Sequence, residues 1–366
     1  MHDLSNESPW AASMAVGYSH KREPLAMVVI KAAYAIDIET GALTPLKKKP
    51  DIEAADQHEG EPLKSALIAT GECSPPKVGG EFYILDATLT LPNGETPAAE
   101  ANVAITFSNA HANGHRQTKP FNKTIRAVGK RQWQGSWVLP SMSKPEPLKP
   151  ISLTYENAYG GTDPDAAADP KEKHPSYLAN YAGRGYVADA KRCTGIELPQ
   201  LETAPFINSP ADRPTPAGFG PLPVFWAPRR TEQGTADIEA AKRGGCPYGA
   251  DAKATLHNVA PLDQRFPTPW QGGEIVTLTN ILTGVQYGKA VNITLPNITP
   301  QIDLVEKGDT KALTAVFDTF WIDAKKNQLY LIYRAANPNR VAKTEAGWII
   351  VRDAQAPLNT EQQEAA

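Results

Sequence analysis

Hydrophobic and polar residues alternate in several short stretches of the chain, and each such stretch predicts a β-strand with one buried face. In the clearest stretch, Leu25 to Ile38, every second residue from Val28 onward is apolar, and Glu39-Thr40-Gly41 follows as a turn. A hairpin is therefore expected at this point. Further strands are expected at residues 81–91, 103–107, 124–128, 133–139, 151–155, 276–278, 291–295, 313–322, 328–333 and 348–351.

These strands are separated by turns more than by helical segments, which predicts a mainly β protein with antiparallel, sandwich-like lobes, long ordered loops and few short helices. Asn93-Gly94 and Asn113-Gly114 are hairpin-turn signals between expected strands. Helical character is confined to residues 237–243 and 251–256. Within one structural unit, the expected parts are an N-terminal β-rich lobe at 10–139, a loop segment at 140–273, a C-terminal β-rich lobe at 274–352 and a polar tail at 353–366.

Proline sets the middle of the chain apart from both ends. The chain has 33 prolines in 366 residues, and 15 of them lie between Pro140 and Arg230. Because proline fixes φ and cannot donate a backbone hydrogen bond, regular structure should be sparse there. The same segment carries large aromatic residues such as Tyr155, Phe219 and Trp226, which a solvated linker lacks. We therefore expect long ordered loops that pack on the sheets.

Charge and composition disfavour several classes of function. The 37 Lys and Arg residues nearly balance the 40 Asp and Glu residues, so the chain lacks the basic field that gathers nucleic acid. The most apolar stretch is broken by Lys31 and Asp37 and is shorter than the ~20 residues of a membrane-spanning helix. The three cysteines are far apart and no signal-peptide pattern begins the chain. A cytoplasmic protein that contacts neither membrane nor nucleic acid is expected.

None of the motifs that carry cofactor or metal chemistry is complete, so neither is expected. His111 and His115 have the spacing of metal ligands on a helix but flank a turn signal. The stretch Gly183 to Ala188 matches a relaxed dinucleotide fingerprint, but no buried strand precedes it. Asp163 opens a stretch like a calcium loop that lacks the glycine and the glutamate such a loop needs.

Two features leave a choice between function and structure. Glu156 and Asp163 suggest the two carboxylates of a glycoside hydrolase, with Asp263 as a further acid or base, although carboxylates this close in sequence more often cap turns. The loop Gly218-Phe219-Gly220-Pro221, followed by Trp226 and Arg229, combines permissive glycines with aromatic rings. Such a loop either seals a core or presents a binding face.

Two motifs are specific enough to suggest a family: Tyr155-Glu156-Asn157-Ala158-Tyr159-Gly160-Gly161 and Pro216-Ala217-Gly218-Phe219-Gly220. Further matching pieces include Ala260-Pro261-Leu262-Asp263-Gln264-Arg265 and Gly272-Gly273-Glu274. With these segments, which follow in consistent order from about Trp10 to about Val351, the chain resembles the bacterial family called domain of unknown function 2169. The resemblance covers nearly the whole chain.

The resemblance implies a non-catalytic adaptor or chaperone of type VI secretion. Such a protein binds an effector toxin in the cytoplasm and helps load it onto a spike protein of the valine-glycine-repeat (VgrG) or PAAR type. The candidate residues for partner binding or family motifs are Tyr155, Glu156, Tyr159, Phe219, Trp226, Arg229, Asp263 and Arg265. Among them, Phe219, Trp226 and Arg229 are candidate anchors, because Trp and Arg are enriched in interface hot spots.

Two other functions stay open at this point. One is a β-sandwich hydrolase or carbohydrate-active enzyme that uses Glu156, Asp163 or Asp263 as acid and base. The other is a structural component of the secretion particle itself.

Overall fold

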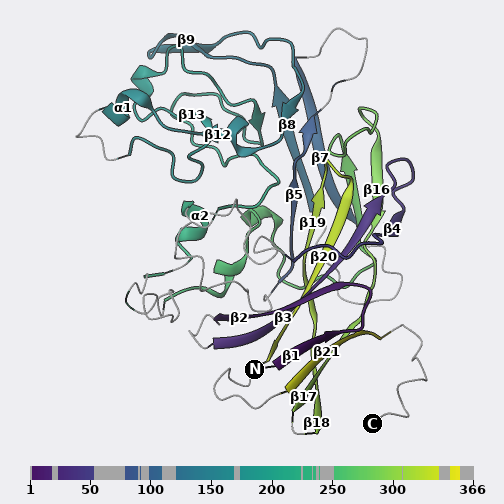
Figure 1. The fold of residues 1–366 in the computed structure, drawn as a ribbon. Coiled ribbons are helices and arrows are strands. Elements are labelled where there is room, and N and C mark those ends of the chain that lie inside the picture. Colours follow the sequence, from purple (N-terminus) through teal and green to yellow (C-terminus); the bar gives the residue numbers. More distant parts are fainter. Residues whose placement is uncertain are drawn as a thin grey trace.

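A computed structural model of the chain describes residues 2–18, 24–52, 79–89, 91, 99–108, 121–168, 174–223, 226–232, 234–235, 239, 251–306, 308–337 and 347–354. The fold is mainly β, as the alternating pattern predicts (Figure 1). The expected turns at Asn93-Gly94 and Asn113-Gly114 lie outside these ranges, as do His111, His115, Cys73 and Cys246.

The largest sheet has six strands, in the order β2-β3-β20-β19-β5, with β4 paired to the other end of β3. Their bounds are β2 (Ala11–Tyr18), β3 (Pro24–Ile36), β4 (Leu43–Pro45), β5 (Glu81–Leu85), β19 (Val316–Asp323) and β20 (Gln328–Asn337). The hairpin expected after Ile38 is confirmed by the antiparallel pairing of β3 and β4. Gly41 closes its turn with a φ of 76°, a conformation that glycine adopts without strain.

The second sheet has five strands, in the order β14-β8-β7-β15-β16. Their bounds are β7 (Glu100–Ser108), β8 (Phe121–Val128), β14 (Leu201–Glu202), β15 (Ile275–Thr279) and β16 (Ala290–Thr294). Buried and outward positions alternate along β7 and β16. This is the pattern of a sheet with one face on a core.

The two large sheets pack face to face around one apolar core, and we call this unit the sandwich. The ring of Phe82 on β5 lies 4.9 Å from that of Phe107 on β7 and 5.4 Å from that of Phe320 on β19. Buried aromatic side chains of this size stabilise the fold at roughly 25 cal/mol per Å² of apolar surface. Met27, Val29 and neighbours point to the opposite face of the six-stranded sheet, where they form a second, smaller cluster.

The division into an N-terminal lobe at 10–139 and a C-terminal lobe at 274–352 is wrong. Strand β3 pairs with β20, β7 pairs with β15, and β5 runs parallel to β19. Both ranges therefore contribute strands to both large sheets. The alternation along a strand shows which face is buried, but it does not identify the neighbouring strand.

A third sheet of four strands, in the order β1-β21-β17-β18, lies at the lower end of the molecule (Figure 1). It consists of β1 (His2–Asn6), β17 (Pro300–Glu306), β18 (Asp309–Leu313) and β21 (Gly347–Asp353). The alternation pattern did not predict β1, β2 or β17. It predicted one strand over 313–322, where the structure ends β18 at Leu313 and begins β19 at Val316.

The proline-rich middle of the chain forms a separate layer of loops beside β8, at the upper left of Figure 1. We call residues 131–214 the loop lobe. Its regular elements are short: β9 (Trp133–Ser136), β10 (Leu139–Met142), β11 (Ile151–Ser152), β12 (Tyr159–Gly160), α1 (Pro164–Ala168), β13 (Arg184–Gly185) and three-residue 3-10 helices at 155–157 and 190–192. Long ordered loops are thus confirmed.

The loop lobe has its own small core, built around Trp133, Tyr159, Val187, Cys193, Leu198 and Ile207. Two short pairings join it to the sandwich: β11 with β6 (Thr88–Leu89), and β14 with β8. Two expected strands are shorter than predicted here. The stretch 133–139 turns back as a hairpin, and the stretch 151–155 enters a 3-10 helix at Tyr155.

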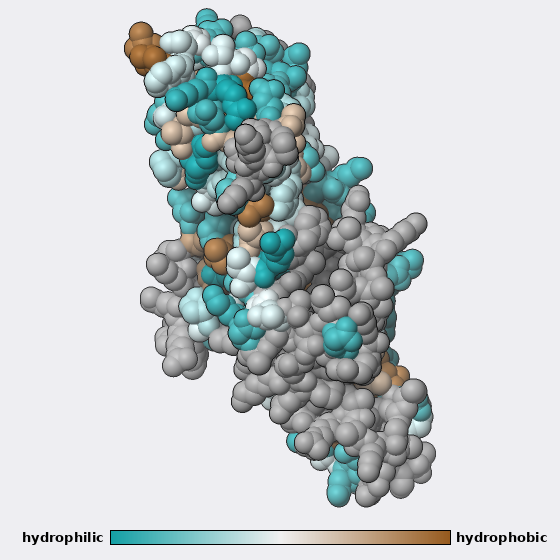
Figure 2. Space-filling model, turned by 90° about the vertical axis from the view of Figure 1, so that its left-hand side faces the viewer, coloured by the Kyte–Doolittle hydropathy of each residue, from teal (hydrophilic) through white to brown (hydrophobic). Residues whose placement is uncertain are grey.

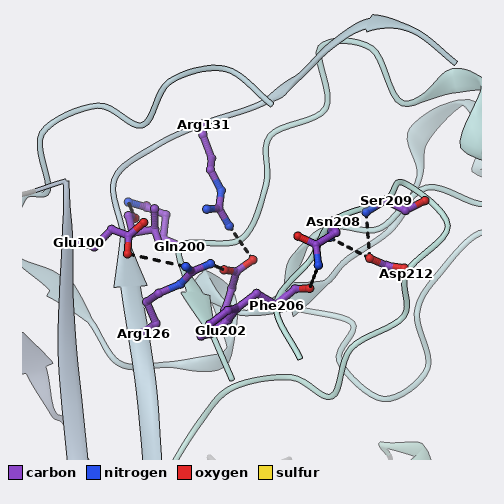
Figure 3. Close-up of polar contacts among 10 residues, drawn as sticks. Glu100, Arg126, Arg131, Gln200, Glu202, Phe206, Asn208, Ser209 and Asp212 are labelled. Atoms are coloured by element: carbon purple, nitrogen blue, oxygen red, sulfur yellow. Dashed lines mark hydrogen bonds and ion pairs between the residues drawn. The ribbon is translucent and has the colours of Figure 1, made fainter. Parts of the chain in front are cut away.

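Beyond the loop lobe, the chain forms helix α2 (Ala227–Arg230), which lies below the loop lobe in Figure 1, and 3-10 helices at Ala254–His257 and Leu262–Gln264. The 3-10 helix at 254–257 overlaps the expected helical stretch 251–256, whereas 237–243 falls almost wholly outside the described ranges. Within those ranges, no helix has the length and apolar character needed to cross a membrane.

Candidate functional site

The family-motif segments meet around a buried lysine on β8. The side chain of Lys123 lies on the buried face of its strand, with those of Ile125 and Ala127. Its Nζ lies 2.6 Å from the Gly218 carbonyl oxygen, 2.8 Å from Gln264 Oε1 and 2.8 Å from Asp263 Oδ2. An ammonium group has three donors, so all three are used. Lys123 thus ties the loop at 218 and the 3-10 helix at 262–264 to the sheet.

Burial and a nearby carboxylate act on this lysine in opposite directions. Removal from water lowers the pKa of Lys123, and the Asp263 carboxylate partly offsets that effect. The Phe219 ring centroid lies 5.3 Å from the ammonium nitrogen, within range of a cation–π contact. The Asp263 side chain is 54% exposed, so it is the part of this cluster that reaches solvent.

Tyr155 packs on the glycine loop from the side of the loop lobe. A Cβ at position 218 would lie 2.5 Å from the Tyr155 ring, so only glycine allows this approach. The Tyr155 hydroxyl donates to the Gly220 carbonyl over 3.1 Å, and the Trp226 ring meets the tyrosine ring edge-on at 5.4 Å. Burial raises the pKa of Tyr155 far above its usual range, so the hydroxyl stays a donor.

Buried Arg229 and partly buried Arg265 hold the next loops in place. Arg229 on α2 donates to the carbonyl oxygens of Leu222 and Leu256, over 2.8 and 3.3 Å. Arg265 donates to both Glu232 carboxylate oxygens at 3.1 Å, and its Nε donates to the Ala260 carbonyl at 2.8 Å. Because proline-rich loops make few ladder hydrogen bonds, guanidinium groups supply the missing donors for these carbonyls.

The structure brings together six of the eight residues predicted from the sequence: Tyr155, Phe219, Trp226, Arg229, Asp263 and Arg265. Phe219 and Trp226 are buried, with 1% and 6% of their surface exposed. In this structure they fill space beneath the loops and do not present their rings to solvent. A partner contact by these side chains stays a prediction.

Glu156 and Tyr159 lie away from this cluster. Glu156 is exposed in the 3-10 helix at 155–157, whereas Tyr159 is buried in the core of the loop lobe, 5.0 Å from the Tyr177 ring. Asp163 caps α1: its Oδ1 accepts from the Asp165 and Ala166 amides, and its Oδ2 accepts from the Ala188 amide over 2.9 Å. The three carboxylates of the hydrolase alternative are thus held by three different local structures.

Sequence reasoning missed a second polar cluster, where the loop lobe joins β8 (Figure 3). Arg126 and Arg131 each donate to a different oxygen of buried Glu202, both over 2.6 Å. The Phe206 ring covers the Arg126 guanidinium group at 3.6 Å. Arg126 and Glu202 are direct partners in the β8–β14 register, so this cluster could be found only once that pairing was known.

Lys123 and Gln264 were also missed, although a signal for Lys123 exists. Extending the alternation of residues 124–128 back by one position puts a lysine on the inward face, and a charge there needs partners. Gln264 gives no such signal. In the structure its Nε2 lies 2.9 Å from the carbonyl oxygens of both Phe82 and Phe219.

Among the described residues, no three His, Cys, Asp or Glu side chains lie close enough together to hold one metal ion. Gly183 follows a turn at residues 181–182, and a Cβ at this position would lie 2.5 Å from Asn180 Nδ2 and 2.6 Å from the Ala158 carbonyl oxygen. The next two residues form the two-residue strand β13, parallel to β12. This is not the strand-then-helix setting that a dinucleotide fingerprint needs.

Comparison with known proteins identifies a family. The model of a family described as "Uncharacterized protein conserved in bacteria (DUF2169)" matches residues 20–334, which is most of the chain. No curated protein and no solved structure matches.

Proposed function

The chain belongs to the DUF2169 family of bacterial proteins, and on that premise we propose that it is a cytoplasmic, non-catalytic adaptor of type VI secretion. In this role it binds an effector toxin and helps load it onto a VgrG-type or PAAR-type spike protein. The proposal rests on the resemblance of its motifs to that family and on the surface described next.

The observation that carries the proposal is the distribution of exposed apolar side chains. Among the described residues, the large exposed ones are Trp137, Val138, Leu139, Leu178, Tyr181, Phe206, Leu262 and Trp348. All but Trp348 lie between residues 137 and 262, in the loop lobe and the loops that follow it. Three of them, Trp137, Val138 and Leu139, are consecutive, and an exposed apolar patch favours a protein-binding role.

The face that carries these loops is turned toward the viewer in Figure 2. There, apolar atoms project from the top of the molecule, at the end where Figure 1 places β9. A stable interface buries about 800 Å² on each partner, so an adaptor needs a face of this extent. The buried motif residues hold the loops of this face in one conformation, so less conformational entropy is lost when a partner binds.

The decisive experiment removes the gene from a bacterium that fires a type VI secretion system. We expect the effector to fall in the secreted fraction and to stop co-purifying with the spike protein, while the spike itself is still secreted. Restoring the gene should restore both signals. Normal effector secretion and normal effector–spike co-purification in the deletion strain would contradict the proposal.

Two further measurements separate the other functions. If the chain appears in the secreted fraction at an amount comparable to the spike, it is a structural part of the particle. If the pure protein turns over glycans or peptides, and Glu156→Gln abolishes the turnover, it is a hydrolase. For an adaptor we expect neither result.

The role of the buried tryptophan can be tested in the same assays. Trp226→Ala removes the ring that packs against Tyr155, so we expect lower thermal stability and, as a consequence, weaker effector binding. A variant that binds poorly while its melting temperature is unchanged would instead place Trp226 in the interface.

A further inference from the structure

The β9–β10 hairpin ends in three consecutive exposed apolar residues, Trp137, Val138 and Leu139, which we call the hairpin tip. Their exposed fractions are 56%, 64% and 79%. No charged residue occurs in the hairpin from Trp133 to Met142. Three large apolar side chains in a row at a projecting turn keep apolar surface in water, which a soluble protein avoids unless the surface is used.

The rest of the hairpin is fixed to the loop lobe. Trp133, at its base, is buried in the core of the lobe, and its amide and carbonyl bond to Ile196 and Gly195 over 3.0 and 2.8 Å. The Thr194 hydroxyl donates to the Gly135 carbonyl over 2.7 Å. A tip carried on such a base is ordered before binding, so little conformational entropy is lost when a partner covers it.

The charge next to the tip is positive. Lys191 Nζ lies 5.4 Å from the centroid of the Trp137 ring, and Arg192 follows it in the same 3-10 helix. Asp189 is the nearest acidic residue in sequence, and its Oδ1 already accepts the Lys191 amide over 3.0 Å. A surface that faces the tip gains from carboxylates placed opposite these two cations.

We infer that the hairpin tip inserts into an apolar pocket on the effector, with acidic residues on the pocket rim facing Lys191 and Arg192. This inference rests on the proposed function, since it names the surface through which the adaptor holds its cargo. The size of the tip agrees with a pocket: three side chains are too few for a flat interface but are typical of a buried hot spot. Trp137 and Leu139 are the expected anchors, and the neighbouring loop-lobe surface forms the rim.

An apolar tip beside basic residues is also compatible with a membrane surface. Stable attachment to anionic lipid is typical of larger basic clusters or of a second anchor. The tip has one cation, Lys191, over its Trp137 ring, and Arg192 follows Lys191 in the chain. A protein pocket is therefore the better match, and membrane binding is one of the outcomes of the test.

The test uses the full chain and, as the probe, the purified effector toxin whose secretion is lost in the deletion strain, with binding followed by calorimetry. Leu139→Asp and Trp137→Ala change the tip, Lys191→Glu reverses the adjacent charge, and Trp348→Ala is the matched control. Trp348 is 55% exposed but lies on β21, in the four-stranded sheet at the lower end of the molecule. Circular dichroism and melting temperature establish that each variant is folded.

We expect Leu139→Asp and Trp137→Ala to weaken binding by tenfold or more, and Trp348→Ala to change it by less than twofold. Lys191→Glu should weaken binding and make the affinity less sensitive to salt, because one attractive charge pair is lost. If the wild type binds and the tip variants bind equally well, the inference fails while the proposed function stands. If the wild type does not bind the toxin, the proposed function fails and the inference with it.

Vesicles of phosphatidylglycerol and phosphatidylcholine form the last arm. Sedimentation of the wild type with these vesicles, lost in Leu139→Asp, together with equal toxin binding by both proteins, would overturn the inference in favour of membrane contact. No sedimentation of either protein, together with the loss of toxin binding in Leu139→Asp, supports it.

Discussion

In the sandwich, long strands from both ends of the chain are joined by continuous backbone hydrogen bonds, and large apolar side chains fill the space between the sheets. In the loop lobe, by contrast, polar side chains join short pieces of backbone. Buried Asn180 shows the second arrangement. Its Nδ2 donates to the carbonyl oxygens of Tyr155 and Tyr159 over 2.8 and 3.0 Å. Arg213 likewise donates to the Val187 carbonyl over 2.7 Å.

This difference has a physical origin in the proline content. Every proline removes one backbone donor, and the loops that result still carry carbonyl groups that must be satisfied when buried. Side-chain amides and guanidinium groups meet that need in the loop lobe. The stability of the sandwich should therefore be sensitive to a loss of side-chain volume. The stability of the loop lobe should be sensitive to a loss of hydrogen-bond partners.

The largest expected effect breaks the sandwich. Phe82→Ala removes a fully buried ring that contacts Phe107, Phe121, Phe266 and Phe320, and we expect a loss of about 4 kcal/mol in the free energy of unfolding. Urea denaturation measures the loss. Trp348→Ala, an exposed aromatic control, should cost less than about 0.5 kcal/mol. Equal effects at both positions would contradict the apolar core described for the sandwich.

The next effect concerns the junction between the two regions. Glu202→Gln leaves Arg126 and Arg131 without their shared carboxylate in a buried setting, and we expect a loss of about 3 kcal/mol. The control is Glu197→Gln. Glu197 lies near Lys130 and Arg184, but its side chain is about half exposed, so water screens the contact and the expected loss is below about 1 kcal/mol. Similar losses for both variants would show that the junction does not depend on burial of the charges.

A smaller effect should stay within the loop lobe. Asn180→Ala leaves the Tyr155 and Tyr159 carbonyls without their side-chain donor, at a cost of about 2 kcal/mol. We expect faster amide hydrogen exchange in residues 155–187 and little change in strands β3 and β20. Faster exchange throughout both regions would show that the lobe and the sandwich unfold as one unit.

The smallest effect at neutral pH is expected from Tyr159→Phe. Burial raises the pKa of Tyr159 from 10.0 to about 12, so the folded state keeps this hydroxyl protonated where the unfolded chain does not. Its contribution to stability is complete below pH 10 and is lost as the pH rises through about 12.

The phenylalanine variant should therefore lose less stability than the wild type between pH 10 and pH 12, and differ little from it at pH 7. Thermal melts across this range provide the measurement, with the exposed residue Tyr181, changed to phenylalanine, as the control. The other buried tyrosines are present in all three proteins, so the difference isolates Tyr159. If the stabilities of the wild type and Tyr159→Phe fall in parallel as the pH rises from 10 to 12, the raised pKa of Tyr159 is contradicted.

Sequence patterns were informative wherever one face of a strand alternates cleanly. Strands β3, β7, β8 and β20 alternate in this way, and each was expected close to its observed place. Strand β2 was not expected, because residues 11–15 are mostly small and show no clear alternation. In β17, Asp303 interrupts the apolar run; it is buried because Arg352 on β21 pairs with it over 2.9 Å.

The candidate site was predicted in part, and the reason lies in the range of the contacts. Motif residues such as Phe219 and Asp263 could be selected from their local sequence. Their partner Lys123 lies 96 residues before Phe219 and 140 before Asp263, and no periodicity connects a strand to a loop at such distances. Phe219 is buried in the large apolar core, among residues distant in sequence, so its burial too could not be read from the motif alone.

The position of β3 has a consequence for how the protein is made. This 13-residue strand lies between β2 and β20, so one of its edges has no neighbour until residues 328–337 have been synthesised. At ribosomal rates of about 5–20 residues per second, roughly 15 to 60 seconds pass between the two events. Throughout that time the nascent chain carries an unpaired apolar edge, which is a template for aggregation. We therefore expect the yield of folded protein to depend on how well β3 is protected during translation.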